Sequence, residues 1–449
     1  MAPERYQSDS SDASSLGKPL KFEFSGKTAK NRFLKAAMTE RISSWDPKDE
    51  KARGIPSKNL INVYKRWGEG GYGQILTGNI MIEYDQLEAM GNPIIPPDAE
   101  FSGPRFEAFK ELATAAKAYG SLVVGQVSHP GRQCESRIQK DPISASDVQL
   151  EGKSSEVMGM QFAKPHAASQ EELNRVINSF AHAAEFLERA GYNGIELHGA
   201  HGYLLAQFLS QSTNHRTDKY GGCLENRLRL ILEIADAVRQ RVSSSFIVGI
   251  KVNSVEFQEK GFSPEEAREL CMKLEEKRFD YVELSGGTYE SLAFEHKRES
   301  TKKRESFFIE FAEQIVSPLA KTKAYVTGGL KTVGAMVKTL ETVDGVGIAR
   351  PACQEPHLPN DILAGKVTGA IKMKLDENNF GLTNMAAGTQ IRQVGKDQEP
   401  VDFSVQGNVD GFMKDMEAWG KKMGEDKEMK EFGYIDLSQV AKPYGVASR

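Results

Sequence analysis

The stretch "GIELHGAHGYLLAQFLS" (194–210) joins a short apolar run to two histidines, a tyrosine and a second, helix-like apolar run. The first six residues have the length and near-continuous apolarity of a strand that is buried on both faces of a parallel sheet. A polar loop and a helical run follow directly. The stretch is therefore typical of one strand–loop–helix unit, and the fold depends on how often such a unit recurs.

Seven more runs of the same kind flank this one. They are "FLKAAM" (33–38), "YGQILTGNI" (72–80), "SLVVGQV" (121–127), "FIVGIKVN" (246–253), "DYVELSGG" (280–287), "KAYVTGG" (323–329) and "GVGIAR" (345–350). Helical patterns lie between them, and Ser169 and Ser263 stand where two of these helices should be capped. Eight strands alternating with helices predict an α/β fold, a (β/α)8 TIM barrel. A doubly wound open sheet is the alternative, but no GxGxxG motif follows any of the runs.

Three regions follow from this pattern. We expect residues 1–19, rich in Ser and Asp, to be a disordered tail, and residues 20–370 to form the barrel. Residues 371–449 are polar and form a C-terminal extension whose amphipathic helix (409–423) either packs on the barrel or contacts another subunit. The connection 128–169 is too long for a simple loop, which predicts a small hairpin or lid over the active face.

Composition excludes several classes of function. The net charge is −4, the basic residues are scattered, and no run approaches the roughly 18 apolar residues of a spanning helix. The N-terminus lacks the apolar region of a secretory signal, and the four cysteines form no CxxC pair. We expect a cytoplasmic protein, monomeric or homodimeric, that acts on a small molecule and binds neither nucleic acid, membrane nor metal.

Two glycine-containing turns follow the last two strands, "VTGGL" and "GIARP". TIM barrels commonly bind phosphate there, because glycines let backbone N–H groups approach phosphate oxygens. Arg350 could add a forked, charge-assisted contact. The alternative is that Gly328 and Gly329 only make a tight turn. With Arg350 and the barrel frame, we favour a phosphate site.

Polar side chains interrupt three of the apolar strands: Asn79, Gln126 and Lys251. Burying such groups costs about 1–3 kcal/mol each unless they are paired. A planar heterocycle with alternating N and C=O groups would pair them, and Lys251 would stabilise negative charge near a ring N–C=O group, as in a flavin. An ion pair inside the barrel is the other interpretation of Lys251.

The histidines and the tyrosine of the first stretch have three interpretations. They could fill the core, or His198 and His201 could bind a metal, although no Asp or Glu motif stands beside them to complete the site. Alternatively, two imidazoles, neutral or cationic, could donate to one substrate oxygen. Polarising a carbonyl would make the conjugated β-carbon a hydride acceptor, and Tyr203 would protonate the α-carbon.

The chain resembles the Old Yellow Enzyme family of FMN-dependent NAD(P)H:flavin oxidoreductases, or ene-reductases, from about residue 20 to residue 363. The motifs that carry the resemblance are "NRFLKAAMTE" (31–40), "GQVSHPGRQ" (125–133), "AGYNGIELHGAHGYLLAQFLSQSTNHRTDKYGG" (190–222), "LENRLR" (224–229), "VTGG" (326–329) and "GIARPACQEP" (347–356). "SGGTYE" (285–290) and "RPACQEPHLPND" (350–361) are similar to the fungal and bacterial NADH-oxidase-like branch.

The resemblance implies FMN as cofactor, NADH or NADPH as hydride donor, and an α,β-unsaturated carbonyl compound, an activated alkene, as substrate. It also implies a role for each site residue. The flavin would be lined by Ala36, Ala37, Met38 and Thr39. Its pyrimidine side would be bound by Asn79 and Gln126, and its phosphate would be held by Gly328, Gly329, Ala349 and Arg350. The substrate oxygen would be held by His198 and His201, and the proton would come from Tyr203. Two positions depart from the family pattern, because many members carry Arg at the place of Lys251 and some carry Cys at the place of Thr39.

Other activities remain open from sequence alone. Lys251 could form a Schiff base in an aldolase or lyase on the same barrel. A metal-dependent hydrolase would use His198 and His201 as ligands. A narrower alternative keeps FMN but assigns the protein to one reductase, isomerase or dehydrogenase step of secondary metabolism.

Overall fold

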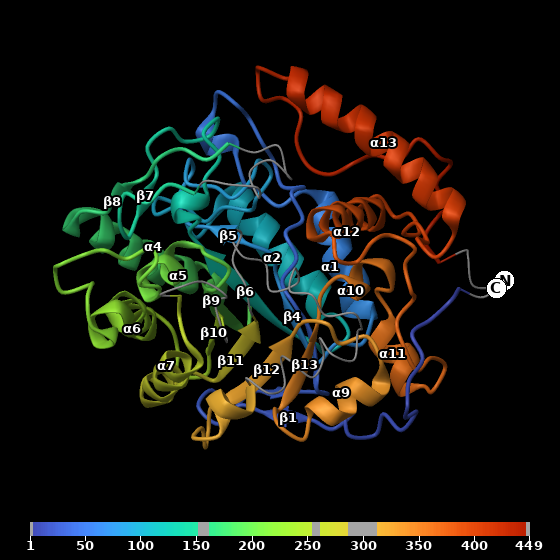
Figure 1. Cartoon of the computed structure of the whole chain (residues 1–449), viewed down its shortest axis with the longest axis horizontal. Helices are drawn as coiled ribbons and strands as arrows, with labels where there is room; N and C mark the ends of the chain where they lie inside the picture. The colour runs from blue at the N-terminus through green and yellow to red at the C-terminus, as the bar shows by residue number, and fades with distance from the viewer. Residues whose placement is uncertain (1–2, 151–160, 254–260, 286–311, 446–449) are drawn as a thin grey trace.

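The computed structural model describes residues 3–150, 161–253, 261–285 and 312–445, and its centre is a closed barrel of eight parallel strands (Figure 1). In ring order the strands are β3 (Phe33–Lys35), β4 (Gln74–Leu76), β6 (Leu122–Ser128), β9 (Gly194–Gly199), β10 (Ile247–Asn253), β11 (Tyr281–Ser285), β12 (Lys323–Thr327) and β13 (Gly345–Ile348). β13 pairs with β3, and β4 pairs with β6. The TIM barrel and all eight strands predicted from the sequence are thereby confirmed.

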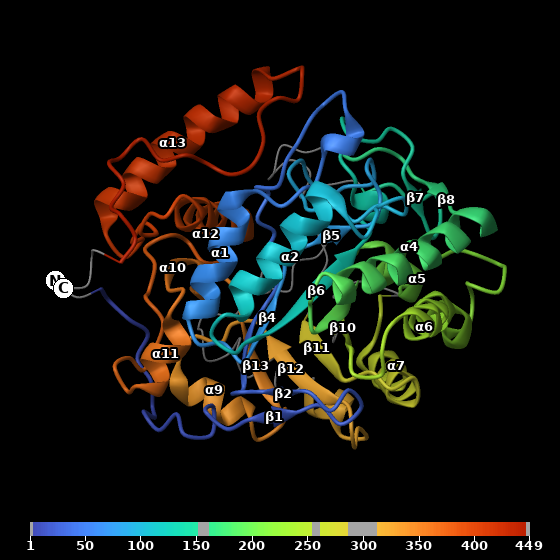
Figure 2. The same cartoon turned by 180° about the vertical axis from the view of Figure 1, so that it is seen from behind.

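The two ends of the barrel differ. At the N-terminal end, large side chains such as Leu34, Tyr281 and Tyr325 point into one buried cluster. A hairpin of β1 (Leu20–Lys21) and β2 (Thr28–Ala29) adds Leu20 and Phe22 to this cluster and lies below β12 and β13 in both views (Figure 2). This end is therefore closed by packed side chains, which leaves the C-terminal end for a site.

Helices surround the barrel and bury its outer surface. They include α1 (Lys58–Glu69), α2 (Gly103–Lys117), α4 (Gln170–Arg189), α5 (Leu204–Leu209), α6 (Leu224–Arg241), α7 (Pro264–Glu276), α9 (Val333–Thr339), α10 (Pro351–Gln354) and α11 (Leu358–Leu363). Ser169 and Ser263 both form complete capping boxes, as their positions before acidic residues predicted. Among the described helices, none has the length and apolarity that a bilayer crossing requires.

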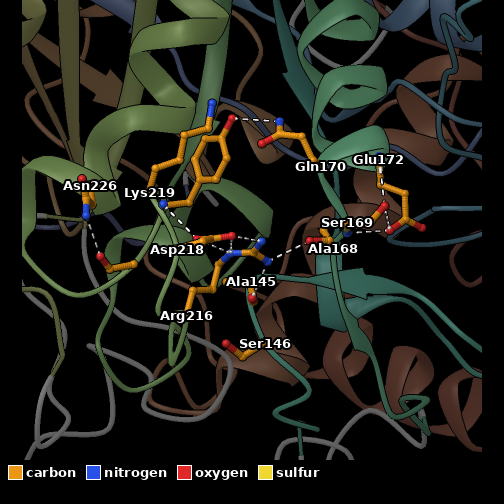
Figure 3. Close-up of polar contacts among 12 residues, drawn as sticks. Ala145, Ser146, Ala168, Ser169, Gln170, Glu172, Arg216, Asp218, Lys219 and Asn226 are labelled. Atoms are coloured by element: carbon orange, nitrogen blue, oxygen red, sulfur yellow. Dashed lines mark hydrogen bonds and ion pairs between the residues drawn. The ribbon is translucent and has the colours of Figure 1, made fainter.

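The long connection after β6 contains two short strands, β7 (Ile143–Ser144) and β8 (His166–Ala167). They pair in parallel, so they do not form a hairpin, which was one of the two possibilities that we expected; the other, a lid, stays a prediction, and residues 151–160 lie outside the described part. Figure 3 shows how Arg216, from the loop after α5, joins them to the barrel. Its guanidinium donates to the carbonyl oxygens of Ala145 (3.1 Å) and Ala168 (2.8 Å) and is itself held by Asp218.

The C-terminal extension folds onto the barrel. Its helices are α12 (Phe380–Gly395), which packs against α1 and α10, and α13 (Gln406–Glu425), which lies along the outside of the molecule (Figures 1 and 2). A small apolar cluster with Phe403, Phe412 and Ile435 holds the two helices together. The extension therefore packs on the barrel through α12, one of the two arrangements that the sequence left open, while a contact of its amphipathic helix with another subunit stays a prediction.

Residues 3–19 do not form the disordered tail that we expected. The N–H of Tyr6 donates to the Ala370 carbonyl (3.0 Å), Arg5 pairs with Glu355 (2.6 Å), and Leu16 is buried. Composition was a poor guide because the Ser and Asp side chains bond to nearby backbone groups, and one apolar anchor and one short backbone pairing suffice to fix the segment.

Candidate active site

A cavity opens at the C-terminal ends of the barrel strands. All of the predicted site residues except Ala36 line it: Ala37, Met38, Thr39, Asn79, Gln126, His198, His201, Tyr203, Lys251, Gly328, Gly329, Ala349 and Arg350. Ala36 is fully buried behind it, and its N–H donates to the Ile348 carbonyl (2.9 Å). Ala36 therefore belongs to the barrel wall, and its assignment to the flavin surface is not supported.

His198, His201 and Tyr203 form one wall of the cavity. The ring centroids of His198 and Tyr203 are 4.6 Å apart and those of His198 and His201 are 5.3 Å apart, both pairs edge to face. His201 has a φ of 59°, the left-handed region, and its Nε2 lies 2.9 Å from Ser285 Oγ at the end of β11. Asn79 Nδ2 donates to the Tyr203 hydroxyl (3.4 Å), so the phenol faces the residue that directly precedes β5 (Ile80–Met81).

Both imidazoles are neutral at physiological pH. Burial, then the neighbouring His201 and Lys251, lowers the pKa of His198 well below its usual value. Burial and Lys251 lower the pKa of His201 to about 3. A neutral imidazole carries a single N–H donor. Of the two protonation states left open by the sequence, the neutral one is therefore favoured, and the pair can offer two donors to one acceptor.

A polar network lies inside the barrel beneath this wall. Lys251 Nζ pairs with Glu283 Oε1 at 2.9 Å, which is the ion pair that the sequence left as an alternative. Lys251 lines the cavity all the same. Beside it, Glu196 accepts from Gln126 Nε2 (2.7 Å) and from the Tyr281 hydroxyl (2.9 Å), and burial together with Glu283 raises the pKa of Glu196 well above normal.

The glycine turns lie at another side of the same cavity. Gly328 and Gly329 have φ values of 145° and 72°, where residues with a Cβ are strained. A Cβ on Gly347 would lie 1.7 Å from Thr327 Oγ1, a buried hydroxyl that lines the cavity and has no hydrogen-bond partner in the described structure. Arg350 completes this region, and its guanidinium donates to Thr383 of α12.

A model of the NADH:flavin oxidoreductase / NADH oxidase family matches residues 15–368. The chain belongs to this family. It is 54% identical over 437 residues to the NADH-dependent flavin oxidoreductase nadA of Aspergillus parasiticus, covering 97% of this chain and 98% of that protein. Among solved structures, morphinone reductase has a TM-score of 0.65 at 22% identity, over 82% of this chain and 92% of its own. An Old Yellow Enzyme homologue from Zymomonas mobilis has a TM-score of 0.62 at 21% identity, over 82% and 98%.

This flavin oxidoreductase, a member of the Old Yellow Enzyme family, uses FMN and a nicotinamide nucleotide as cofactors. The residues present fit FMN. Gly328, Gly329 and Arg350 offer backbone donors and a cation for a phosphate, and the unpartnered Thr327 hydroxyl marks a polar wall that a ligand can satisfy. Gln126 and Lys251 provide an amide and a cation for a planar heterocycle.

Several cavity residues of the oxidoreductase were not predicted from its sequence. They are Tyr6, Arg41, Glu88, Ser285, Lys331, Glu377, Phe380, Met385 and Tyr434. Most come from the N-terminal segment and the C-terminal extension, where no strand pattern marks them. Arg41 pairs with Glu88 and lies 5.1 Å from the Tyr434 ring, whose hydroxyl donates to the Thr39 carbonyl (3.0 Å).

Glu196 and Glu283 were also missed, although a signal was available. Each is a carboxylate within an apolar strand run, the same feature that singled out Lys251. Their pairing depends on the register of neighbouring strands, which places Glu283 directly beside Lys251 and Glu196 beside Gln126. Within the described ranges, no group of three or more His, Cys, Asp or Glu side chains could hold a metal.

Proposed function

We propose that this enzyme reduces the activated C=C bond of α,β-unsaturated carbonyl compounds. The observation that carries the proposal is the wall of two neutral imidazoles and one phenol at the mouth of the barrel. When bound, FMN supplies the hydride, which it takes from the nicotinamide nucleotide. One cavity would serve both nucleotide and substrate.

The two imidazoles would bind and polarise the substrate. Their N–H groups can donate to one carbonyl oxygen, which withdraws electron density from the conjugated β-carbon and makes it a better hydride acceptor. The contact between His201 Nε2 and Ser285 Oγ (2.9 Å) fixes the His201 ring, and the bond from the backbone N–H of His201 to Asn253 Oδ1 (3.2 Å) fixes its loop. Preorganised donors of this kind cost no reorganisation during the reaction.

Tyr203 would deliver the proton to the α-carbon. Its phenol lies in contact with His198 and accepts a hydrogen bond from Asn79 Nδ2 (3.4 Å). That donor would stabilise the phenolate left after proton transfer. The other assignments have less support: Lys251 is engaged by Glu283, which makes it a poor Schiff-base nucleophile, and His198 and His201 have no third metal ligand among the described residues.

A second candidate keeps the same chemistry and narrows the substrate. Side chains from the extension, among them Phe380, Met385 and Tyr434, line the cavity together with the barrel residues. Such added walls favour an FMN-dependent reductase, isomerase or dehydrogenase that acts on one secondary metabolite. A panel of cyclic and acyclic enones would separate the two, because a broad ene-reductase reduces many of them.

The variant Tyr203→Phe tests the proposed chemistry. We expect reduction of bound flavin by NADH to change less than twofold, and reoxidation by 2-cyclohexenone to slow by about 10²–10⁴, the usual contribution of a general acid. Stopped-flow absorbance measures the two half-reactions separately. Tyr192→Phe is the control, because this buried phenol lies outside the cavity and its hydroxyl has no partner in the described structure. Equal losses in both half-reactions of Tyr203→Phe would contradict the role.

A further inference from the structure

A second cation, Lys331, lies at the glycine-turn side of the cavity. It follows Gly329 by two residues and lines the cavity together with Gly328, Gly329 and Arg350. Its ammonium group pairs with the Glu377 carboxylate and donates to the Tyr6 hydroxyl (3.1 Å), and Tyr6 in turn donates to Glu377. Tyr6 and Glu377 also line the cavity.

The backbone around this triad is well fixed. Tyr6 belongs to an N-terminal segment that pairs with the chain just after the barrel, at Ala370. Glu355 joins the same segments, because it pairs with Arg5 (2.6 Å) and accepts from the Ile371 N–H (2.7 Å). Both chain ends therefore hold their side chains against the β12 loop, and the Lys331 and Glu377 side chains are only 14% and 15% exposed.

The carboxylate of Glu377 is ionised at neutral pH. Burial alone would raise its pKa, but Lys331, the Tyr6 hydroxyl and Arg350 outweigh burial and lower it. Arg350 and Lys331 thus both stabilise the negative charge of the Glu377 carboxylate. Two cations and the Glu377 carboxylate leave a net positive charge at this side of the cavity, because the other carboxylate there, Glu355, is paired with Arg5. A net positive charge suits a phosphate monoester with its charge of about −1.5 to −2.

We propose that Lys331 binds the FMN phosphate beside Arg350, and that Glu377 weakens this contact through its ion pair with Lys331. The proposal rests on FMN binding in this cavity and extends the phosphate site from the glycine turns to a lysine and a carboxylate. An ammonium group has three donors, so it can serve the carboxylate, the phenol and a phosphate oxygen together. Because the pair is largely buried, its charges are poorly screened by solvent.

Riboflavin gives a direct test, because it has the same ring system as FMN but no phosphate. Apoenzyme is titrated with FMN and with riboflavin, and flavin fluorescence reports the Kd of each. In Lys331→Met the Kd for FMN should rise by about tenfold or more, as expected for a lost charge-assisted hydrogen bond. The Kd for riboflavin should change less than twofold. Lys338→Met is the matched control: it removes an exposed lysine from α9, outside the cavity, and should alter neither Kd.

Glu377→Gln should act in the opposite direction. It removes a negative charge next to the phosphate while keeping an acceptor for Tyr6, so the Kd for FMN should fall by about three- to tenfold, with riboflavin again unchanged. General damage to the cavity cannot tighten binding, so this variant separates electrostatics from misfolding.

Equal shifts for both flavins in Lys331→Met, or no shift for FMN, would overturn the proposal, as would weaker FMN binding by Glu377→Gln. If wild-type apoenzyme bound neither flavin, the cofactor site itself would be refuted. Ene-reduction is tested independently by Tyr203→Phe.

Discussion

The two imidazoles of the cavity, His198 and His201, give the folded state a pH dependence of their own. In the unfolded chain a histidine has a pKa of about 6.5. In the folded protein burial and nearby charges lower the pKa of His201 to about 3 and that of His198 well below normal. Below pH 6.5 the unfolded chain therefore binds protons that the folded chain does not. This contribution to the free energy of unfolding is present above pH 6.5 and is lost as pH falls.

Each imidazole that stays uncharged in the folded protein should lower the free energy of unfolding by about 1.4 kcal/mol for every pH unit below pH 6.5. In the double variant His198→Asn/His201→Asn, we expect the free energy of unfolding to fall less steeply between pH 6.5 and 5 than in the wild type. The two slopes should differ by about 2–3 kcal/mol per pH unit, since two groups are removed. Urea unfolding at several pH values measures this slope. His215→Asn, which changes an exposed histidine, should leave the slope as in the wild type. Parallel curves for all three proteins would show that the imidazoles are charged in the folded state.

Single residues were predictable where their chemistry conflicts with their surroundings. His198, Tyr203 and Lys251 stand out as polar groups within or next to apolar runs, and all three line the cavity. Partners were not predictable in the same way, because a pairing such as that of Lys251 with Glu283 depends on strand register. The proton states of the histidines also depend on burial, which a one-dimensional pattern does not measure.

Among the elements, α12 supports Tyr434, a side chain of the extension that reaches the site. Gly388 of α12 lies against the Tyr434 ring, and a Cβ there would come within 2.3 Å of ring atoms. Gly388→Ala should therefore displace Tyr434 and weaken its hydrogen bond to the Thr39 carbonyl. Overpacking a tight contact costs about 1–3 kcal/mol, more than the roughly 1 kcal/mol that alanine gains in a helix.

Thermal unfolding and the flavin absorbance spectrum test this contact together. Gly388→Ala should lower Tm and shift the spectrum, because Thr39 and Tyr434 both line the cavity. Gly420→Ala is the matched control in α13, where the glycine is exposed and a Cβ meets no atom within 4 Å. There the helix propensity acts alone and should raise stability by about 0.5–1 kcal/mol. A stabilised Gly388→Ala with an unchanged spectrum would show that Tyr434 does not depend on this contact.

Strands and helices of the barrel were predictable because each has a local signal, such as an apolar run or a capping serine. The parallel pairing of β7 with β8 was not, because it depends on backbone bonds between distant segments and on Arg216, far along the chain, which bonds to the residue that follows each strand (Figure 3). Amphipathicity identified α13, whose buried residues face the cluster around Phe412. It gave no indication of the surface on which the helix would pack.

At the scale of the whole molecule, the barrel and the two chain ends form one unit around the cavity. The alternation of strand and helix predicts the barrel, because each strand and helix has a local pattern in the sequence. The convergence of residues 3–19 and 371–445 on the site is a set of long-range contacts, such as Tyr6 with Glu377, for which the sequence has no periodic signal. Both ends therefore contribute walls to the cavity.

This organisation predicts that damage within the extension is felt at the flavin. Phe412 is 1% exposed and packs edge to face on Phe403, with a centroid separation of 5.0 Å. Their cluster includes Leu375 and Ile435, which flank the cavity residues Glu377 and Tyr434 along the chain. Phe412→Ala should cost about 3–5 kcal/mol, as large-to-small changes of a buried phenylalanine do.

Because the cluster supports the cavity walls, Phe412→Ala should unfold and release its flavin in one transition, at a lower temperature than the wild type. Circular dichroism reports unfolding, and the rise of flavin fluorescence reports flavin release. Both are measured with saturating FMN, so that binding stabilises each protein by mass action under the same conditions. Met413→Ala, on the exposed side of α13, is the control. It should shift neither the unfolding temperature nor the temperature of flavin release by more than the few degrees that correspond to about 0.5 kcal/mol. A Phe412→Ala protein that loses part of its helix signal in an early transition while keeping its flavin would contradict the prediction. In that case the extension would be a separate cooperative unit, and the barrel alone would be enough to hold the cofactor.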